Sequence, residues 1–428
     1  ILLNNMDYLT KSILLELLNF STSQNKKLFV VGGAMRDYLS QKSCSDFDLT
    51  GKNAAEVGVN FSRALNFTCF PLDKTPGRNT ARVILNQNQH LDFTDLQGRN
   101  IEEDLSQRDF TINAMSLPLS EFLSEKKGII DPYKGQEDFS NKKIRVLQGP
   151  IFSSDPLRIL RAFRFSATLE FKIVADTLTN ISLHKERLSE SSPERIWHEL
   201  TLFFKTPVTF PSIITMHDCG LLDCLFNVSG IALAQYEKVE SLLNDPRENF
   251  SEYADKFNTN AFLDKHYLLK LSVLKNATQD CNLRLSNAES QLVEQALNGA
   301  KSLTQVYLKG SPELNETYEL TRSIHEKLLA SIVLFITDSD GSDISERTLF
   351  CNHIFKYYYD QFLPAMNEKP LLNGEDIINQ FQLSPSPLFG RILNDIQKAQ
   401  VLGIITTPED AVTLAGDIIQ SQTKESNG

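Results

Sequence analysis

The spacing of apolar residues changes once along this chain, near residue 150, and that change limits the folds open to it. Before residue 150, short apolar or alternating runs are typical of strands, at 27–31, 47–50, 80–85 and 90–94. Beyond Asp155, apolar residues recur almost throughout at helical spacing. The sequence therefore predicts an α+β domain with a mixed or antiparallel sheet, followed by all-helical domains.

Helices are expected at 1–20, 34–39, 101–117, 158–170, 194–204, 236–243, 268–274, 288–297, 312–335, 344–361, 374–381 and 389–402. Between them, no apolar stretch approaches the roughly 18–20 residues that cross a bilayer, so no membrane partner is expected. The cysteines form no C-x-x-C pair and show no zinc-ligand spacing with histidine, which is typical of reduced thiols in a cytoplasmic protein.

The charge of the chain is unevenly distributed. Its net charge is −11, yet residues 1–205 hold 26 Lys and Arg against 25 Asp and Glu, whereas residues 206–428 hold 17 against 29. An acidic half does not exclude binding to RNA through a local basic stripe elsewhere. The motifs described next all lie in the balanced half.

A two-glycine turn follows the first apolar run. Gly32-Gly33 ends that run, and Ala34-Met35-Arg36-Asp37 begins a predicted helix. Backbone N–H groups in such a turn, together with the helix N-terminus, attract phosphate. We expect Gly33 and Arg36 to contact a triphosphate, the alternative being an ordinary structural turn.

Two carboxylates alternate around Phe47 in the next predicted strand. Residues i and i+2 of a strand point to one face, so Asp46 and Asp48 lie side by side and repel unless a cation intervenes. Mg²⁺ prefers oxygen ligands, including substrate phosphates. The pattern predicts that Asp46 and Asp48 are catalytic and hold Mg²⁺, with Asp92 on a neighbouring strand as a candidate third carboxylate. A solvated surface pair is the alternative.

The segment Arg108-Asp109-Phe110-Thr111-Ile112-Asn113-Ala114 mixes charged and apolar residues. On the helix expected there, Asp109 and Asn113 are an i, i+4 pair and share a face. Such a pair can hold ribose hydroxyls while Arg108 reaches a phosphate. The alternative is a solvated face above apolar residues in the core.

A charged ridge marks the first long helix of the second region. Asp155 is a suitable N-cap before Pro156, and Arg158, Arg161 and Arg164 recur every three residues among apolar side chains. Arginines on so apolar a helix must find anions. Asp155 and Arg158 can present donors and acceptors to a base edge. The alternative is that all four belong to buried salt bridges.

Taken in order, GGAMRD, DFD, RDFTINAM, DPYKG and DPLRILRAFRF resemble the class II tRNA nucleotidyltransferase and bacterial poly(A) polymerase family, and LLNGED resembles its C-terminal part. The resemblance implies a polymerase-β-like nucleotidyltransferase head at 1–150, a helical neck at 151–215, a helical body at 216–365 and an RNA-binding helical tail at 366–428. It also implies that Asp46 and Asp48 hold Mg²⁺, and that Asp155 and Arg158 select the base of CTP or ATP. Further nucleotide contacts are implied for Gly33, Arg36, Arg108, Asp109, Asn113, Arg161 and Arg164.

The reaction that the resemblance implies is addition of CMP, AMP or both from CTP and ATP to the 3′ end of tRNA, without a template and with release of pyrophosphate. Only Asp95–Gln107 separates the strand of Asp92 from RDFTINA. This stretch is shorter than the loop of members that build the whole CCA end, and resembles members that add CC and stop.

Four alternatives stay open from the sequence: a poly(A) polymerase, an A-adding partner enzyme, an inactive RNA-binding module, and a nucleotidyltransferase acting on a small molecule or a protein. Some relatives carry a metal-binding HD domain. Here His217-Asp218 is the one HD pair in the sequence and lacks further histidine ligands, so no working HD site is expected. The oligomeric state is not predicted.

Overall fold

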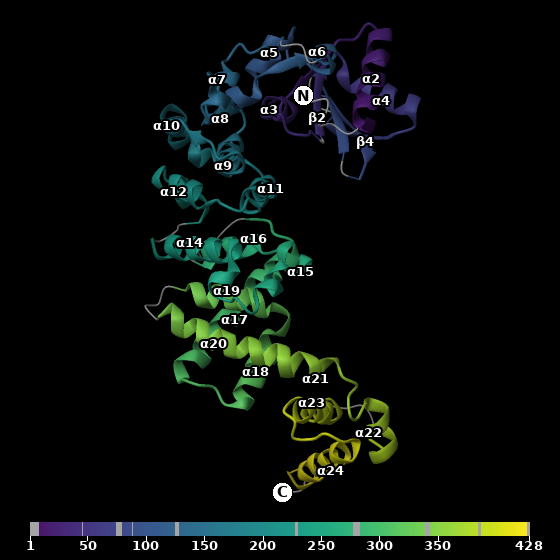
Figure 1. Cartoon of the computed structure of the whole chain (residues 1–428), viewed down its shortest axis with the longest axis vertical. Coiled ribbons are helices and arrows are strands. Elements are labelled where there is room, and N and C mark those ends of the chain that lie inside the picture. The colour runs from purple at the N-terminus through teal and green to yellow at the C-terminus, as the bar shows by residue number, and fades with distance from the viewer. Residues whose placement is uncertain are drawn as a thin grey trace. The chain divides into compact units, whose positions relative to one another are not determined.

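The computed structural model describes residues 8–44, 46–73, 79–87, 89–124, 128–226, 230–276, 283–338, 343–383 and 387–425. The chain divides into two compact units, Ile1–Leu225 and Phe226–Gly428 (Figure 1). The first unit holds the sheet and the second is helical, which confirms the predicted α+β class. The boundaries at 150, 215 and 365 within these units stay predictions.

The first unit is built on a six-stranded mixed sheet with strand order β3-β4-β5-β2-β1-β6. Strand β2 runs antiparallel to β1 and parallel to β5, so that Asp48 lies opposite Val31 on one side and Asp92 on the other. Strands β1, β2, β4 and β5 were predicted, whereas β3 and β6 were not. The strands span Leu28–Val31 (β1), Asp46–Gly51 (β2), Thr68–Asp73 (β3), Thr80–Asn86 (β4), Gln89–Asp95 (β5) and Ser116–Pro118 (β6).

Exposed and buried side chains alternate along the start of β2 and distinguish its two faces. Phe47 and Leu49 are each 1% exposed and belong to the core cluster, whereas Asp46 and Asp48 point to the other face and are exposed. Helix α4 (Ala54–Leu65) covers the apolar face by packing on β4 and β5. Because side chains alternate along a strand, burying Phe47 and Leu49 places both carboxylates together on the uncovered face.

The remaining helices of the first unit connect the strands or follow the sheet. The helix expected over 101–117 is confirmed only at 101–106, as α5, and is wrong beyond it. After α5, Phe110 forms a bridge to Val146, and Ser116–Pro118 pairs with β1 as a strand. Strand pairing of this apolar run outweighs its helical spacing. The helices are α2 (Tyr8–Ser23), α3 (Gly33–Ser40), α5 (Ile101–Ser106), η1 (Thr111–Asn113), α6 (Leu119–Leu123), α7 (Gly135–Ser140), α8 (Ile151–Ser154), α9 (Arg158–Leu169), α10 (Ala175–His184), η2 (Lys185–Glu190), α11 (Pro193–Phe204), α12 (Phe210–Asp218) and α13 (Leu221–Leu225), with the strands β7 (Lys143–Ile144) and β8 (Lys172–Ile173) pairing in parallel.

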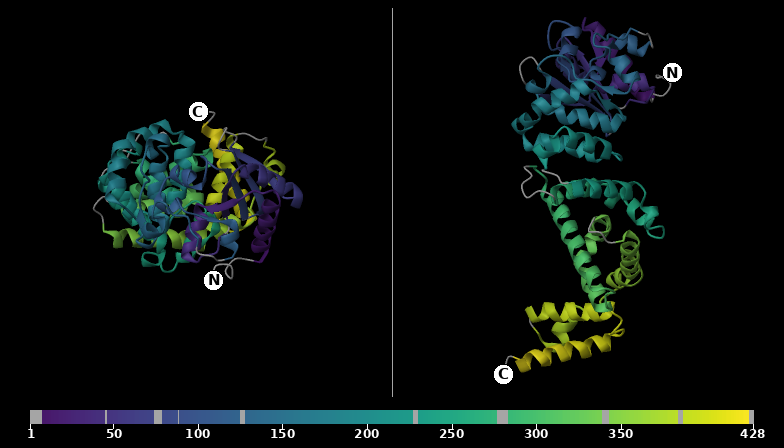
Figure 2. Two further views of the ribbon diagram at one scale, coloured as in Figure 1. Left: turned by 90° about the horizontal axis from the view of Figure 1, so that it is seen from above. Right: turned by 90° about the vertical axis from the view of Figure 1, so that its left-hand side faces the viewer.

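The described part of the second unit is helical, and α23 packs on α24 at its C-terminal end (Figure 2). The helix expected over 312–335 is interrupted at His325, and the one expected over 344–361 ends in a π-helical turn, η6. Its elements are α14 (Gly230–Asn244), η3 (Pro246–Glu248), η4 (Ala254–Asn258), α15 (Asn260–Leu263), α16 (Tyr267–Asn276), α17 (Asn287–Lys309), α18 (Leu314–Ile324), η5 (His325–Lys327), α19 (Leu328–Thr337), α20 (Ile344–Tyr357), η6 (Tyr358–Phe362), α21 (Leu363–Asn367), α22 (Gly374–Phe381), α23 (Pro387–Val401) and α24 (Pro408–Glu425).

Among the described residues, no helix combines the length and the apolar character needed to span a bilayer.

Candidate functional site

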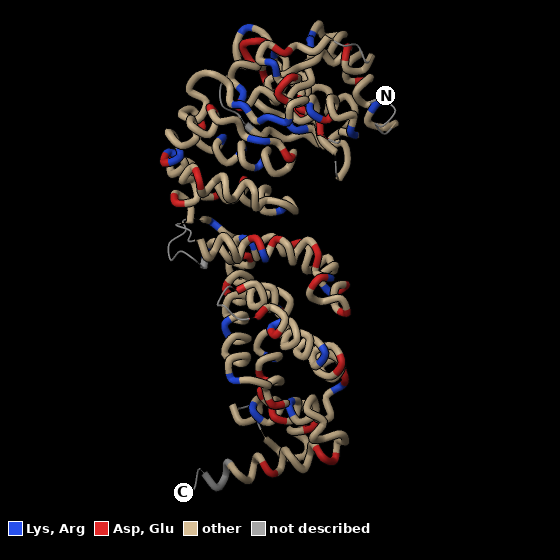
Figure 3. The backbone as a smooth tube through the Cα atoms, turned by 60° about the vertical axis from the view of Figure 1, so that its left-hand side comes forward, with Lys and Arg blue, Asp and Glu red and all other residues tan. Residues whose placement is uncertain are grey.

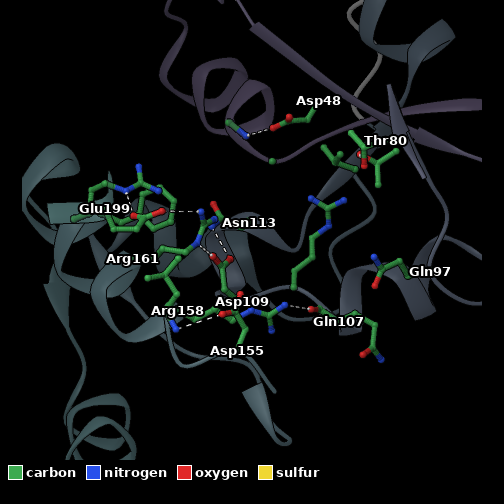
Figure 4. Close-up of a pocket in the computed structure, with 18 of the residues that line it drawn as sticks. Asp48, Thr80, Gln97, Gln107, Asp109, Asn113, Asp155, Arg158, Arg161 and Glu199 are labelled. Atoms are coloured by element: carbon green, nitrogen blue, oxygen red, sulfur yellow. Dashed lines mark hydrogen bonds and ion pairs between the residues drawn. The ribbon is translucent and has the colours of Figure 1, made fainter. Parts of the chain in front are cut away.

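A pocket of about 790 Å³ opens in the first unit, between the end of β1, the segment around Asp109 and the helices α9 and α11 (Figure 4). All of the residues that the sequence singled out for nucleotide contacts line it, although they come from segments far apart in the chain. They are Gly33, Arg36, Arg108, Asp109, Asn113, Asp155, Arg158, Arg161 and Arg164. Asp48 lines the pocket too, whereas Asp46 and Asp92 are not among its lining residues.

Asp48 stands beside the glycine turn. The N–H of Gly33 donates to Asp48 Oδ2 over 3.4 Å. Gly32 has φ +64°, in the left-handed region, and a Cβ atom built there would lie 2.5 Å from Asp48 Oδ2. Glycine at this position thus serves two needs, because any side chain would be strained and would displace the carboxylate.

The walls of the pocket change the ionisation of Asp48. Although the carboxylate is open to water inside the pocket, crowding by the surrounding protein raises its pKa, and nearby Asp92 raises it further. Arg108 and the N–H of Gly33 act in the opposite direction. A carboxylate whose charge is disfavoured in this way gains from a nearby cation.

Asp46 and Asp92 have partners of their own on the same face of the sheet. His90 Nδ1 lies 2.8 Å from Asp46 Oδ1. Arg82 donates to both oxygens of Asp92, from Nε and from a terminal nitrogen, each over 2.7 Å. Among the described residues no group of three or more His, Cys, Asp and Glu side chains is arranged to hold a metal. A metal site here would therefore use Asp46 and Asp48 together with oxygens of a substrate.

The rear of the pocket is organised around a buried carboxylate. Asp109 is 5% exposed, receives hydrogen bonds from Asn113 Nδ2 (2.7 Å) and from the N–H of Phe110 (2.9 Å), and pairs with Arg161 Nε at 2.8 Å. Burial opposes ionisation of Asp109, but Arg161 and the hydrogen bonds outweigh it and lower its pKa to about 2. The predicted contact between Asp109 and Asn113 exists, although a single 3₁₀ turn brings them together in place of a helix.

Three guanidinium groups surround one aromatic ring in this wall. The Cζ atoms of Arg36, Arg161 and Arg164 lie 4.8, 5.3 and 4.3 Å from the ring centroid of Phe165. Arg36 also donates to Asn113 Oδ1, and burial lowers the pKa of its guanidinium. The cluster concentrates positive charge at one wall of the pocket.

Glu199 on α11 balances part of this charge. It is 6% exposed and accepts from Arg164 Nε over 2.7 Å, while Arg161 lies 3.6 Å away (Figure 4). Arg161 is therefore held between Asp109 and Glu199. Glu199 was not among the predicted site residues. Its place on the apolar face of the amphipathic helix α11 was a signal, because a buried carboxylate is costly unless it is paired.

Asp155 and Arg158 both have partners within the protein. Asp155 pairs with Arg195 of α11, whose terminal nitrogen lies 3.3 and 3.2 Å from its two oxygens, and Arg158 donates to the backbone oxygen of Gln107 over 2.9 Å. Helix α9 begins at Arg158, with Leu157 as its capping residue, so the assignment of Asp155 as N-cap is wrong by two positions. Asp155 Oδ1 still accepts from the N–H of Leu157 at 3.3 Å. Asp155, Arg161 and Arg164 form ion pairs, although the pair of Asp155 with Arg195 is not buried, and contact of these residues with a nucleotide stays a prediction.

Arg108 lies on the opposite wall and is oriented by Asp104, whose Oδ2 is 3.0 Å from an Arg108 terminal nitrogen. Asp104 also accepts from the N–H of Gln97 over 3.0 Å, so one buried carboxylate fixes both ends of the segment that joins β5 to Arg108. Asp104 lies four residues before Arg108, a spacing typical of a local ion pair, but it was not among the predicted site residues.

The HD pair lies apart from this pocket. His217 and Asp218 end helix α12, their side chains are 42% and 72% exposed, and His217 Nδ1 is 3.6 Å from Asp218 Oδ1.

Comparison with known proteins gives these residues a context. A family model described as "Poly A polymerase head domain" matches residues 28–145, and one described as "Probable RNA and SrmB-binding site of polymerase A" matches 170–229. A CC-adding tRNA nucleotidyltransferase of Geobacter sulfurreducens is 28% identical over 399 residues, covering 89% of each chain. Residues 28–145 thus match the poly(A) polymerase head domain, and over most of its length the chain is similar to tRNA nucleotidyltransferases. The family predicted from the five motifs is thereby confirmed.

Other members of this family are similar over comparable lengths. An A-adding tRNA nucleotidyltransferase of Deinococcus radiodurans is 26% identical and covers 89% of this chain and 93% of its own. Among solved structures, the Thermotoga maritima CCA-adding enzyme complexed with tRNA aligns with a TM-score of 0.69 at 23% identity, over 98% of this chain and 97% of its own. This last similarity establishes the fold.

Proposed function

We propose that this protein transfers CMP from CTP to the 3′ end of tRNA and stops after the second C. The observation that carries the transfer reaction is the pocket of the first unit, in which Asp48, the glycine turn and the charged wall of α9 face one another. The relatives at 25–28% identity include CC-adding and A-adding tRNA nucleotidyltransferases, and both types extend a tRNA.

In this reaction the terminal 3′-hydroxyl oxygen of the RNA forms a bond to the α-phosphorus of the nucleotide. The bond from that phosphorus to the bridging oxygen of the β-phosphate breaks, and pyrophosphate leaves. Gly33 and Arg36 stand where a triphosphate meets backbone N–H and guanidinium donors, and Arg108 faces it from the opposite wall. Asp109 and Asn113, which line the same pocket, would then hold the ribose hydroxyls.

The residues present fit a divalent cation of the Mg²⁺ type. Asp46 and Asp48 offer hard carboxylate oxygens from one face of β2, and Mg²⁺ sites in proteins are usually completed by substrate phosphates and water. When bound, Mg²⁺ neutralises charge on the phosphates and favours departure of pyrophosphate. The raised pKa of Asp48 supports this assignment, because a bound cation would favour the charged carboxylate that burial disfavours.

The limit at two C residues is supported by the segment between β5 and Arg108. The structure describes this segment throughout, and α5 fills it as a short helix capped by Asn100, which accepts from the N–H of Glu103 over 2.9 Å. Asp104 accepts hydrogen bonds from both the N–H of Gln97 and the side chain of Arg108. The segment between β5 and Arg108 is therefore short and held by internal hydrogen bonds. It has few residues free to change conformation, as a switch of the pocket from CTP to ATP would require.

The test is incorporation by the purified protein with Mg²⁺ on three RNAs: tRNA without its CCA end, tRNA ending in CC, and an unstructured RNA. Each RNA is offered CTP, ATP or both, and the products are resolved at single-nucleotide resolution. We expect two C residues on the first RNA and no addition to the other two. A single A on the second RNA alone would assign the A-adding step, and long A tails on the third would assign poly(A) polymerase activity.

A further inference from the structure

A second pocket, of about 350 Å³, lies within the second unit. Its walls come from α15 and the turn after it, from η5 with the start of α19, and from the π-helical turn η6. A π-helical turn is rare in proteins and often marks a functional position. The volume suits one nucleotide-sized group and is too small for a duplex.

Planar rings make up much of this pocket. Phe262, His266, His325, Tyr358 and Tyr359 all line it. Phe262 and His266 are stacked at 26° with their centroids 6.1 Å apart, and Tyr359 stacks on Tyr253 at 17° and 5.8 Å. Rings that are already held flat against one another can accept a further planar group at little entropic cost.

Both imidazoles are oriented by a hydrogen bond at Nδ1. His266 Nδ1 lies 2.5 Å from the carbonyl oxygen of Leu263, so Nδ1 must carry the hydrogen, and His325 Nδ1 lies 3.0 Å from the hydroxyl of Tyr358. For both rings, Nε2 has no hydrogen-bond partner among the described residues. Burial lowers the pKa of His266, which favours the neutral ring with Nε2 as an acceptor.

The charge around the pocket is opposite in sign to that of its unit. Residues 226–428 hold 17 Lys and Arg against 27 Asp and Glu (Figure 3). Lys265 and Lys327 nevertheless line the pocket, with Glu326 as the one acidic residue that does so. Lys256 adds a third ammonium, 4.7 Å from the ring centroid of Tyr359. The pair of Lys327 with Glu326, at 3.4 Å, is exposed and weak.

We propose that this pocket binds one unstacked nucleotide of the RNA substrate, with its base against the rings and its phosphodiester at Lys265 and Lys327. Single-stranded RNA is recognised through such stacking, and lysines supply the contact to its backbone. A free nucleoside triphosphate fits less well, because the pocket has neither a glycine turn nor a pair of carboxylates to hold a metal-bound triphosphate. The inference rests on the proposed function in one respect, namely that the substrate is RNA.

The test measures binding of tRNA that lacks its CCA end, in the absence of nucleotides, over a range of salt concentrations. The double variant Lys265→Ala/Lys327→Ala should reduce the slope of log Kd against log salt by about 1, because one phosphate is then no longer neutralised by the protein. His266→Ala should weaken tRNA binding about fivefold or more at every salt concentration, since it removes a stacking surface. Lys301→Ala, an exposed lysine on α17 of the same unit, is the matched control and should leave both quantities unchanged.

Kinetics separate this inference from the proposed function. At saturating tRNA, the double variant should keep the kcat of the unaltered protein and its KM for CTP, and only the KM for tRNA should rise. Wild-type Kd and wild-type salt slope in the double variant would overturn the inference while leaving transfer to tRNA in place. Loss of tRNA affinity in a protein that transfers nothing to tRNA would overturn the proposed function and keep the RNA pocket. Weakened binding of free CTP or ATP without weakened tRNA binding would also overturn the inference.

Discussion

The buried carboxylate of Asp109 allows the charge network of the first pocket to be tested quantitatively. In Asp109→Asn the side chain keeps its shape but loses the charge that faces Arg161 at 2.8 Å. The folded protein lowers the pKa of Asp109 from 3.8 to about 2, which corresponds to about 2 kcal/mol of stability at neutral pH. We expect the variant to lose about that amount.

The pH dependence of this loss has a definite sign. Because the pKa of Asp109 is lower in the folded state than in the unfolded one, its contribution is complete above the unfolded value of 3.8 and declines as the pH falls towards 2. The difference in unfolding free energy between wild type and variant should therefore be constant near pH 7 and fall to about half by pH 3. Urea unfolding at several pH values measures it.

Asp138→Asn is the matched control. Asp138 is also 5% exposed and pairs with Arg145 at 2.9 Å, but it does not line the pocket. Both variants should be less stable, while the KM for CTP should rise, by about tenfold, only in Asp109→Asn. A loss below about 0.5 kcal/mol at pH 7 in Asp109→Asn, or a difference that does not shrink at low pH, would refute the reasoning.

Other predictions concern the same pocket. Asp48→Asn should reduce kcat by roughly a thousandfold, because loss of a metal ligand removes several kcal/mol of transition-state stabilisation. The affinity for tRNA, measured by titration, should stay unchanged. Near-normal turnover would contradict the assignment of Asp48 as a metal ligand. Gly32→Ala should cost about 1–3 kcal/mol in thermal unfolding and most of the activity, since its Cβ would meet Asp48 Oδ2 at 2.5 Å; a stable, active variant would contradict this. Arg158→Ala should narrow the preference for CTP over ATP, measured as a ratio of kcat/KM, more than it weakens tRNA binding; unchanged selectivity would count against base selection by this residue.

Strands β1, β2, β4 and β5 and most helices followed from local patterns, because burial on one face repeats regularly along them. Phe47 and Leu49 indicated the covered face of β2, and thereby the exposed position of Asp46 and Asp48. The helix prediction failed from Asp109 to Leu117, because the apolar residues there enter the core from a β-bridge, a 3₁₀ turn and a strand. Spacing alone does not distinguish these from a helix.

The positively charged residues of the pocket were predictable, but most of their partners were not. Arginines on an apolar helix indicate that anions must lie nearby, yet they do not indicate which ones. Glu199 and Arg195 are brought to the pocket by tertiary packing of α11, and no local spacing connects them to Arg164 or Asp155. Asp104 is the exception, because it lies four residues before Arg108, at the spacing of a helical ion pair.

The position of Arg161 between Asp109 and Glu199 has a consequence for synthesis of the chain. The ribosome makes proteins from the N-terminus, so Asp48, Asp109 and Arg161 leave it before Glu199 does. Until α11 has emerged from the ribosome, Arg161 and Arg164 lack the carboxylate of Glu199 as an ion-pair partner. The pocket is therefore completed only after the residues of all six strands have been synthesised, and a chain that stalls before α11 lacks Glu199 and Arg195 from the pocket wall.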